Sequence, residues 1–111
     1  MTNKEKAAII IKDILTFHLP RVKEGLEKGY VDENQILVIY DHAVRARILG
    51  EQEGLYDEVN AKLEGAKNTF IHELTQLVGD HGRAIWSDTQ FGHDYKLFVN
   101  GVREALRKLK V

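Results

Sequence analysis

Apolar residues recur every three or four positions along one long stretch of the sequence, and this spacing constrains the fold more than any other feature. An α-helix completes a turn in about 3.6 residues, so residues at this spacing share one helical face. They are Leu55, Val59, Leu63, Ala66, Phe70, Leu74 and Val78. Acidic residues gather at the start, where negative charge suits a helix dipole: Glu51, Glu53, Asp57 and Glu58. Gly79 can end this helix, and Gly65 inside it is expected to let a neighbouring helix approach closely.

The N-terminal segment shows the same spacing but contains the only proline of the chain. Thr2 and Glu5 form a capping box, in which each side chain can satisfy a free backbone N–H of the first turn. The apolar stripe that follows consists of Ile11, Leu15, His18, Val22 and Leu26. Because Pro20 lacks an N–H and its ring clashes with the preceding turn, we predict a kink or break near residues 17–19. Gly29 is the predicted end of this segment.

The second segment admits two interpretations. Asp32 and Gln35 form another capping box, and Gly50 is the predicted helix end. The helical stripe between them consists of Leu37, Tyr40, Val44 and Ile48. Residues 36–48 also contain an apolar run and an alternating stretch, so a short β-hairpin that turns at residues 41–43 is the alternative. The capping signals and the lack of a favourable turn dipeptide favour the helix.

The C-terminal segment begins with a third capping box, formed by Ser87 and Gln90, with Trp86 and Phe91 spaced as a hydrophobic staple. Its stripe consists of Phe91, Tyr95, Phe98, Val102, Ala105 and Leu109. A short strand at residues 83–87, paired with residues 95–99, is the competing interpretation of this region.

Three capping boxes and four stripes bounded by glycines indicate the same architecture. We therefore predict an all-α chain, folded as a compact four-helix bundle-like domain over residues 1–111 with its first helix kinked near Pro20. The alternative is an α+β fold with a short hairpin around residues 36–48. A chain of 111 residues has room for one hydrophobic core, and 43% hydrophobic residues are too many for intrinsic disorder.

Charge and cysteine content exclude several classes of protein. A formal net charge of -1 excludes a generally basic nucleic-acid binder, and the lack of cysteine excludes a disulfide scaffold and a thiolate metal site. The apolar run at residues 7–11 is too short for a secretion signal, and no stretch approaches the ~20 apolar residues of a membrane span. We expect a cytoplasmic protein with no membrane partner.

No familiar catalytic or nucleotide-binding motif occurs in the sequence. Four polar residues nevertheless lie on or between the predicted apolar stripes: His18, Asp41, Glu73 and Asp94. Helical bundles can build metal or catalytic sites from inward carboxylates and histidines on separate helices. The simpler interpretation, which we favour, is that each residue reaches water at a stripe border or forms a local pair, as Asp41 could with Arg45. No cofactor is expected.

Two further groups of residues could bind partners. Arg83, Trp86 and Asp88 could form a recognition patch, although Trp86 would equally serve to cap the core. Basic residues near the C-terminus could contact phosphates, with Arg45 and Arg47 extending the patch: Arg103, Arg107, Lys108 and Lys110. We favour a solvated tail that complements the helix dipole. The remaining histidines are expected at the surface: His42, His72 and His81.

The aliphatic runs at residues 9–11 and 36–39 extend around more of a helix than one stripe requires. Self-association would cover this surplus, so the leading hypothesis is a small non-enzymatic interaction protein that forms a homodimer and serves a protein partner not specified by the sequence. One alternative is a metal- or small-ligand-binding bundle, or an enzyme, that uses the inward polar residues. The other is a weak nucleic-acid binder that uses the basic C-terminal helix.

Overall fold

The structure is a computed structural model that describes residues 1–79, 91 and 95–109. Within these ranges every regular element is a helix, which confirms the predicted all-α class. Residues 36–48 lie inside one continuous helix, so the hairpin alternative is wrong. The competing strand at residues 83–87 lies outside the described residues, whereas its suggested partner, residues 95–99, is helical.

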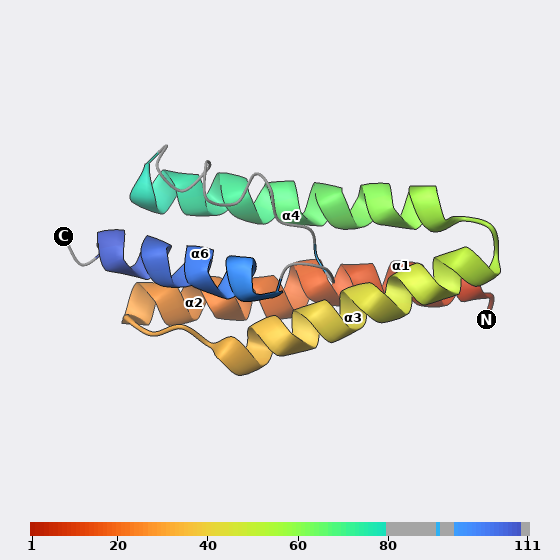
Figure 1. The fold of residues 1–111 in the computed structure, drawn as a ribbon, viewed down its shortest axis with the longest axis horizontal. Coiled ribbons are helices and arrows are strands. Elements are labelled where there is room, and N and C mark those ends of the chain that lie inside the picture. The colour runs from red at the N-terminus through yellow and green to blue at the C-terminus, as the bar shows by residue number, and fades with distance from the viewer. Residues whose placement is uncertain (80–90, 92–94, 110–111) are drawn as a thin grey trace.

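Five α-helices and one π-helical turn make up the described fold (Figure 1). Their bounds are α1 Asn3–Asp13, η1 Ile14–His18, α2 Leu19–Lys28, α3 Glu33–Gln52, α4 Tyr56–Val78 and α6 Tyr95–Leu109. The first three elements follow one another along the molecule, α3 returns beside them, and α4 runs lengthwise along the molecule and packs against α1 and α3. Helix α6 occupies only the half away from the N-terminus. The molecule is elongated, with extents of 47 × 22 × 21 Å. None of the helices within residues 1–79 and 95–109 combines the length and apolar character that a membrane span requires.

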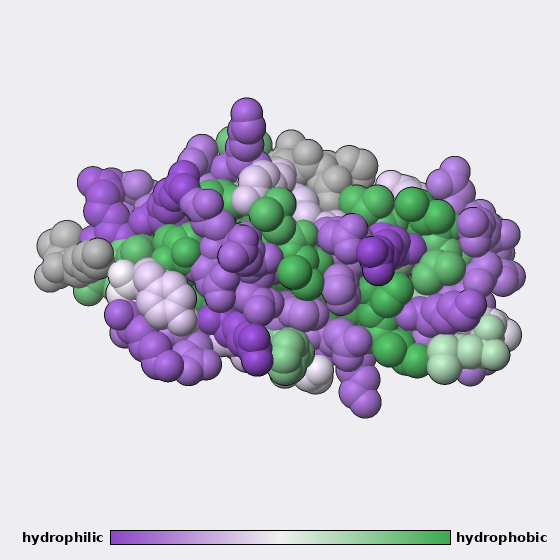
Figure 2. All heavy atoms as spheres, turned by 90° about the horizontal axis from the view of Figure 1, so that it is seen from below, coloured by the Kyte–Doolittle hydropathy of each residue, from purple (hydrophilic) through white to green (hydrophobic). Residues whose placement is uncertain are grey.

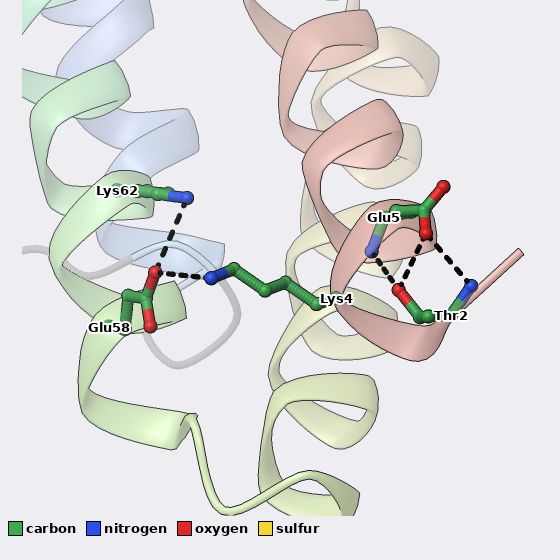
Figure 3. Close-up of polar contacts among 5 residues, drawn as sticks. All are labelled: Thr2, Lys4, Glu5, Glu58 and Lys62. Atoms are coloured by element: carbon green, nitrogen blue, oxygen red, sulfur yellow. Dashed lines mark hydrogen bonds and ion pairs between the residues drawn. The ribbon is translucent and has the colours of Figure 1, made fainter.

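Two of the predicted helix starts have the expected caps. The Glu5 backbone N–H donates to Thr2 Oγ1 at 3.1 Å, and the Thr2 N–H reaches back to the Glu5 carboxylate, which completes the capping box (Figure 3). At the start of α3, the Gln35 N–H donates to Asp32 Oδ1 at 3.1 Å. The Gln35 side chain bonds His18 instead of the Asp32 backbone. The third predicted box, at residues 87–90, lies outside the described residues.

The interruption predicted near Pro20 takes the form of a π-helical turn, not a break. The Leu19 N–H donates to the carbonyl oxygen of Ile14, five residues back, and Pro20 follows at the start of α2. The wider turn accommodates a residue that can neither donate a hydrogen bond nor sit against a normal preceding turn. The core stripe consequently steps by five residues, from Ile14 to Leu19, and the predicted stripe residue Leu15 is 37% exposed.

Gly29 ends α2 as predicted. Its φ of 95° lies in the left-handed region, and the Tyr30 N–H donates to the Gly25 carbonyl oxygen at 2.9 Å. This is the bonding pattern of a Schellman cap, which satisfies the carbonyl groups left free at a helix end.

Gly50 does not end α3, contrary to the prediction, because the helix continues to Gln52 and Gly54 makes the turn with a φ of 71°. Gly50 is instead the point where α3 meets α4: a Cβ atom there would come within 2.7 Å of Val59 Cγ2. The close approach expected at Gly65 is also wrong, since no heavy atom lies within 4 Å of a Cβ built there.

Alanine substitutions of these two glycines measure how much the close packing of α3 on α4 at Gly50 contributes to stability. Gly50→Ala is expected to lower the free energy of unfolding by about 1–3 kcal/mol, because the added methyl group displaces Val59. Gly65→Ala is expected to raise it by up to about 1 kcal/mol, because alanine favours the helix and meets nothing. Urea denaturation followed by circular dichroism measures both changes. Equal effects of the two substitutions would contradict the packing inferred at Gly50.

The core is best defined where α6 packs against the longer helices. Phe98 of α6 is fully buried, with its ring centroid 5.2 Å from that of Phe91, 5.6 Å from that of Tyr40 and 6.0 Å from that of Phe70. Aliphatic side chains complete the fully buried set: Ile14, Val22, Leu26, Ile36, Ile39, Leu63, Leu74 and Val102. Helix α6 is thus joined to α3 and α4 by an aromatic cluster in one half of the molecule, while α1, α3 and α4 form the other half (Figure 1).

Candidate functional site

Helix α3 carries apolar residues on its outward face as well as on its core face. Leu37, Val44 and Ile48 are 50%, 41% and 48% exposed, and we call these three residues the α3 stripe. Their spacings of seven and four residues place them in one row along the helix. The buried side of the same helix is formed by Ile36, Ile39, Tyr40, Ala43, Ala46, Arg47 and Gly50. The described structure therefore covers only one of the two apolar faces of α3.

Two charged residues accompany the α3 stripe. Asp41 and Arg45 form an ion pair, with 3.1 Å between Arg45 Nε and Asp41 Oδ2, and both side chains are more than half exposed. This is the local pair that the sequence suggests for Asp41, and an exposed pair of this kind adds only a few tenths of a kcal/mol to stability. Seen from below, hydrophobic residues gather in the half of the molecule nearer the N-terminus, between hydrophilic ones (Figure 2).

The aliphatic runs that suggested self-association each divide between core and surface. In the first run Ile11 is buried and Ile9 is 44% exposed. In the second, Ile36 and Ile39 are fully buried, whereas Leu37 is half exposed. The second run thus supplies the first residue of the α3 stripe.

His18, one of the four predicted polar residues, contacts another histidine. Its Nδ1 lies 2.9 Å from Gln35 Oε1, and its ring packs edge to face on His42 with 4.8 Å between the ring centroids. His42 is half-buried, not at the surface as expected, and its buried Nδ1 has no hydrogen-bond partner among the described residues. His72 is exposed, as expected.

The other predicted polar residues lie elsewhere. Glu73 pairs with Lys23 of α2, with 3.9 Å between Nζ and Oε2, and Asp41 pairs with Arg45. Asp94 lies outside the described residues. Within the part of the chain that the structure describes, no three histidine or acidic side chains are grouped so that they could hold a metal ion. The described members of the set do not form a common metal site.

Two of the four basic residues named near the C-terminus form ion pairs in the structure. Arg103 forms an ion pair with Glu33 at the start of α3, and Arg107 forms one with Glu104 one turn away. Arg47, which a larger basic patch would require, is only 6% exposed. These pairs leave less positive charge for phosphate binding than the sequence suggests. Lys110 and the predicted recognition patch of Arg83, Trp86 and Asp88 lie outside the described residues, as does His81.

The buried position of Arg47 is a feature that sequence reasoning missed. Arg47 Nε donates to Asn60 Oδ1 at 2.9 Å, but neither terminal nitrogen has a hydrogen-bond partner among the described residues. One oxygen of Glu64 is likewise buried without a partner there, while the other binds Lys67 Nζ at 2.8 Å. Burial lowers the pKa of Arg47, although Tyr56 and Glu64 act in the opposite direction. Its spacing from Tyr40, Ala43 and Gly50 on the core stripe could have revealed this burial.

Substitutions of Arg47 and Asn60 test how the buried guanidinium and its hydrogen bond to Asn60 affect the free energy of unfolding. Arg47→Met keeps the aliphatic length and removes a buried, incompletely bonded charge, so the free energy of unfolding is expected to rise by about 1 kcal/mol. Asn60→Ala removes the partner that the guanidinium has and is expected to lower it by about 1–3 kcal/mol. Chemical denaturation of both variants gives the answer, and a large loss of stability in Arg47→Met would show that the guanidinium stabilises the fold.

Comparison with known proteins gave no match. No family model matches the sequence, and no curated protein or solved structure is significantly similar to the chain.

Proposed function

We propose that this chain is a non-enzymatic interaction protein that forms a homodimer through the α3 stripe. The observation that carries the proposal is the second apolar face of α3, which lies about a third of a turn from the centre of its core face and is half exposed at Leu37, Val44 and Ile48. Removing apolar surface from water contributes about 25 cal/mol for each Å² buried, from which the entropic cost of association is subtracted. A face of this kind on a short bundle is a favourable surface for contact with another apolar helix.

A second copy of the same helix is the occupant whose charges fit best. In an antiparallel pair related by a twofold axis, Leu37 lies opposite Ile48 of the second copy, and the two layers are equivalent by symmetry. Asp41 interrupts the apolar row, and in this register it lies beside Arg45 of the second copy. A polar residue within an apolar seam commonly fixes the register and orientation of paired helices. The local Asp41–Arg45 pair of each copy can thus be exchanged for pairs between copies.

The length of the stripe sets the expected strength of the dimer. From Leu37 to Ile48 the row is about 17 Å long, because an α-helix rises about 1.5 Å per residue. Such a row makes an interface at the small end of the range for stable complexes. We therefore expect a reversible dimer with micromolar affinity.

Sedimentation of the purified chain over a range of micromolar concentrations tests this function. The expected result is a concentration-dependent shift from monomer to dimer that persists at high salt, because apolar contacts supply most of the affinity. A monomer at every concentration would overturn the proposal. A fixed higher oligomer would overturn the twofold pairing, because an isologous contact closes with two copies.

A further inference from the structure

A groove runs between α4 and the two N-terminal elements α1 and η1, and its lining shares no residue with the α3 stripe. It has a volume of about 480 Å³, within the range of pockets that hold small organic ligands. Ile11 and Leu15 line it from the N-terminal helix, and Gly65 and Ala66 line it from α4. From Ala8 to Thr16 the lining extends about 12 Å along the helix. The groove is therefore elongated, open to solvent and mainly aliphatic.

The hydroxyl groups in the groove are already used within their own helices. Thr16 Oγ1 donates to the Lys12 carbonyl oxygen at 2.8 Å, and Thr69 Oγ1 donates to that of Gly65 at 3.0 Å. Each hydroxyl therefore bonds the backbone one turn earlier instead of pointing a free donor at a ligand. This leaves the lysines as the charged groups of the lining.

Gly65 has no packing reason to be glycine in this structure. No heavy atom lies within 4 Å of the Cβ that another residue would add, and glycine inside a helix costs about 1 kcal/mol relative to alanine. Its effect is to keep this part of the groove open. A residue that weakens its helix without improving the packing is typical of a binding site.

Positive charge flanks the aliphatic surface on both walls. Lys62 of α4 shares Glu58 with Lys4 of α1, at 3.7 Å and 3.6 Å, and this bridge joins the two helices beyond one end of the groove (Figure 3). Lys12 on the facing wall has no ion-pair partner among the described residues. An aliphatic surface beside an unpaired ammonium group is complementary to an amphipathic anion.

We propose that this groove binds a medium-chain fatty carboxylate. The alkyl chain lies on Ile11, Leu15 and Ala66 and passes over Gly65, while the carboxylate accepts a hydrogen bond from Lys12 Nζ. The charged end supplies orientation, and the aliphatic surface supplies most of the binding free energy. This site is separate from the α3 stripe, so either proposal can fail without the other.

Calorimetric titration with three ligands of equal chain length tests the head group. Decanoate is expected to bind at least about tenfold more tightly than decan-1-ol, and decyltrimethylammonium is expected to bind more weakly still. Decanoate and decyltrimethylammonium are used below the concentrations at which they form micelles, and decan-1-ol below its solubility limit. Equal affinity for the three would show nonspecific apolar binding and would overturn the proposal.

Two substitutions with matched controls test the location. Gly65→Leu fills the groove and favours the helix, and it is expected to abolish decanoate binding, whereas Asn68→Leu adds the same side chain outside the groove lining and leaves binding intact. Lys12→Gln is expected to weaken decanoate about tenfold and to leave decan-1-ol unchanged, while Lys6→Gln changes neither. Circular dichroism confirms folding, and Gly65→Ala provides a milder variant, expected to weaken binding less than leucine does.

The oligomeric state of Gly65→Leu shows whether the groove binds a carboxylate or a second copy of the chain. If the groove held a second copy of the chain instead of a carboxylate, filling it would change the mass measured by sedimentation, and the proposal would be overturned. The expected result is an unchanged mass with decanoate binding lost.

Discussion

Val44→Glu is expected to convert the dimer into a monomer without unfolding the chain. Val44 is the central residue of the α3 stripe and is 41% exposed, so glutamate at this position meets water in the monomer. In the antiparallel pair it would face Asp41 of the second copy, and the twofold axis repeats this repulsion. Burying two like charges beside one another is strongly unfavourable. We expect the dissociation constant to rise at least about 100-fold, which is about 2.7 kcal/mol.

Sedimentation velocity measures the change in Val44→Glu, and circular dichroism checks that the helix content is retained. Leu97→Glu is the matched control, because Leu97 is an apolar residue that is 53% exposed on α6, away from the stripe. The control is expected to dimerise like the parent chain. If both variants dimerise equally, the α3 stripe is not the interface.

Phe98→Ala is expected to lower the free energy of unfolding more than Gly50→Ala or Asn60→Ala does. Phe98 is fully buried and contacts the rings of Tyr40 on α3, Phe70 on α4 and Phe91, which lies four residues before the start of α6. Removing a buried phenyl ring loses its transfer free energy and leaves a cavity, which together amount to about 3–5 kcal/mol. Because small domains are stable by about 5–15 kcal/mol, this is a large part of the total.

Equilibrium denaturation in urea measures the effect of Phe98→Ala, with Leu97→Ala as the control one residue away. The control removes an exposed side chain and is expected to change the free energy of unfolding by less than about 0.5 kcal/mol. A loss below about 1 kcal/mol in Phe98→Ala would mean that α6 is not held by the aromatic cluster.

The helices could be predicted from the sequence because each one repeats an apolar residue at helical spacing over several turns. Residues 36–40 are rich in β-forming side chains, yet the cap at Asp32 and the continued spacing beyond Tyr40 indicated the helix that the structure contains. The wrong predictions concern contacts between helices. Gly50 looked like a helix end because nothing in its local sequence reveals that Val59 of α4 would pack on it.

The candidate site was only partly predictable for the same reason. The sequence shows an excess of aliphatic residues in α3, but which of them face water depends on where α1 and α4 pack. Arg47 shows the reverse case, because a residue type that is usually exposed lies here among buried neighbours. The groove between α4 and the N-terminal elements α1 and η1 has no sequence signature, because residues more than forty positions apart form its two walls.

The π-helical turn at Ile14–His18 changes which side of the continuous helical segment α1–η1–α2 faces the core. Its wider ring acts as one inserted residue, which rotates everything beyond it by about 100° relative to an uninterrupted helix. Before the turn, α1 directs Ala7 and Ile11 towards the core and packs against α3 and α4. After it, α2 directs Leu19, Val22 and Leu26 towards the core and packs against α3 and α6. One continuous helical segment can thus pack against α3 and α4 in one half of the bundle and against α3 and α6 in the other.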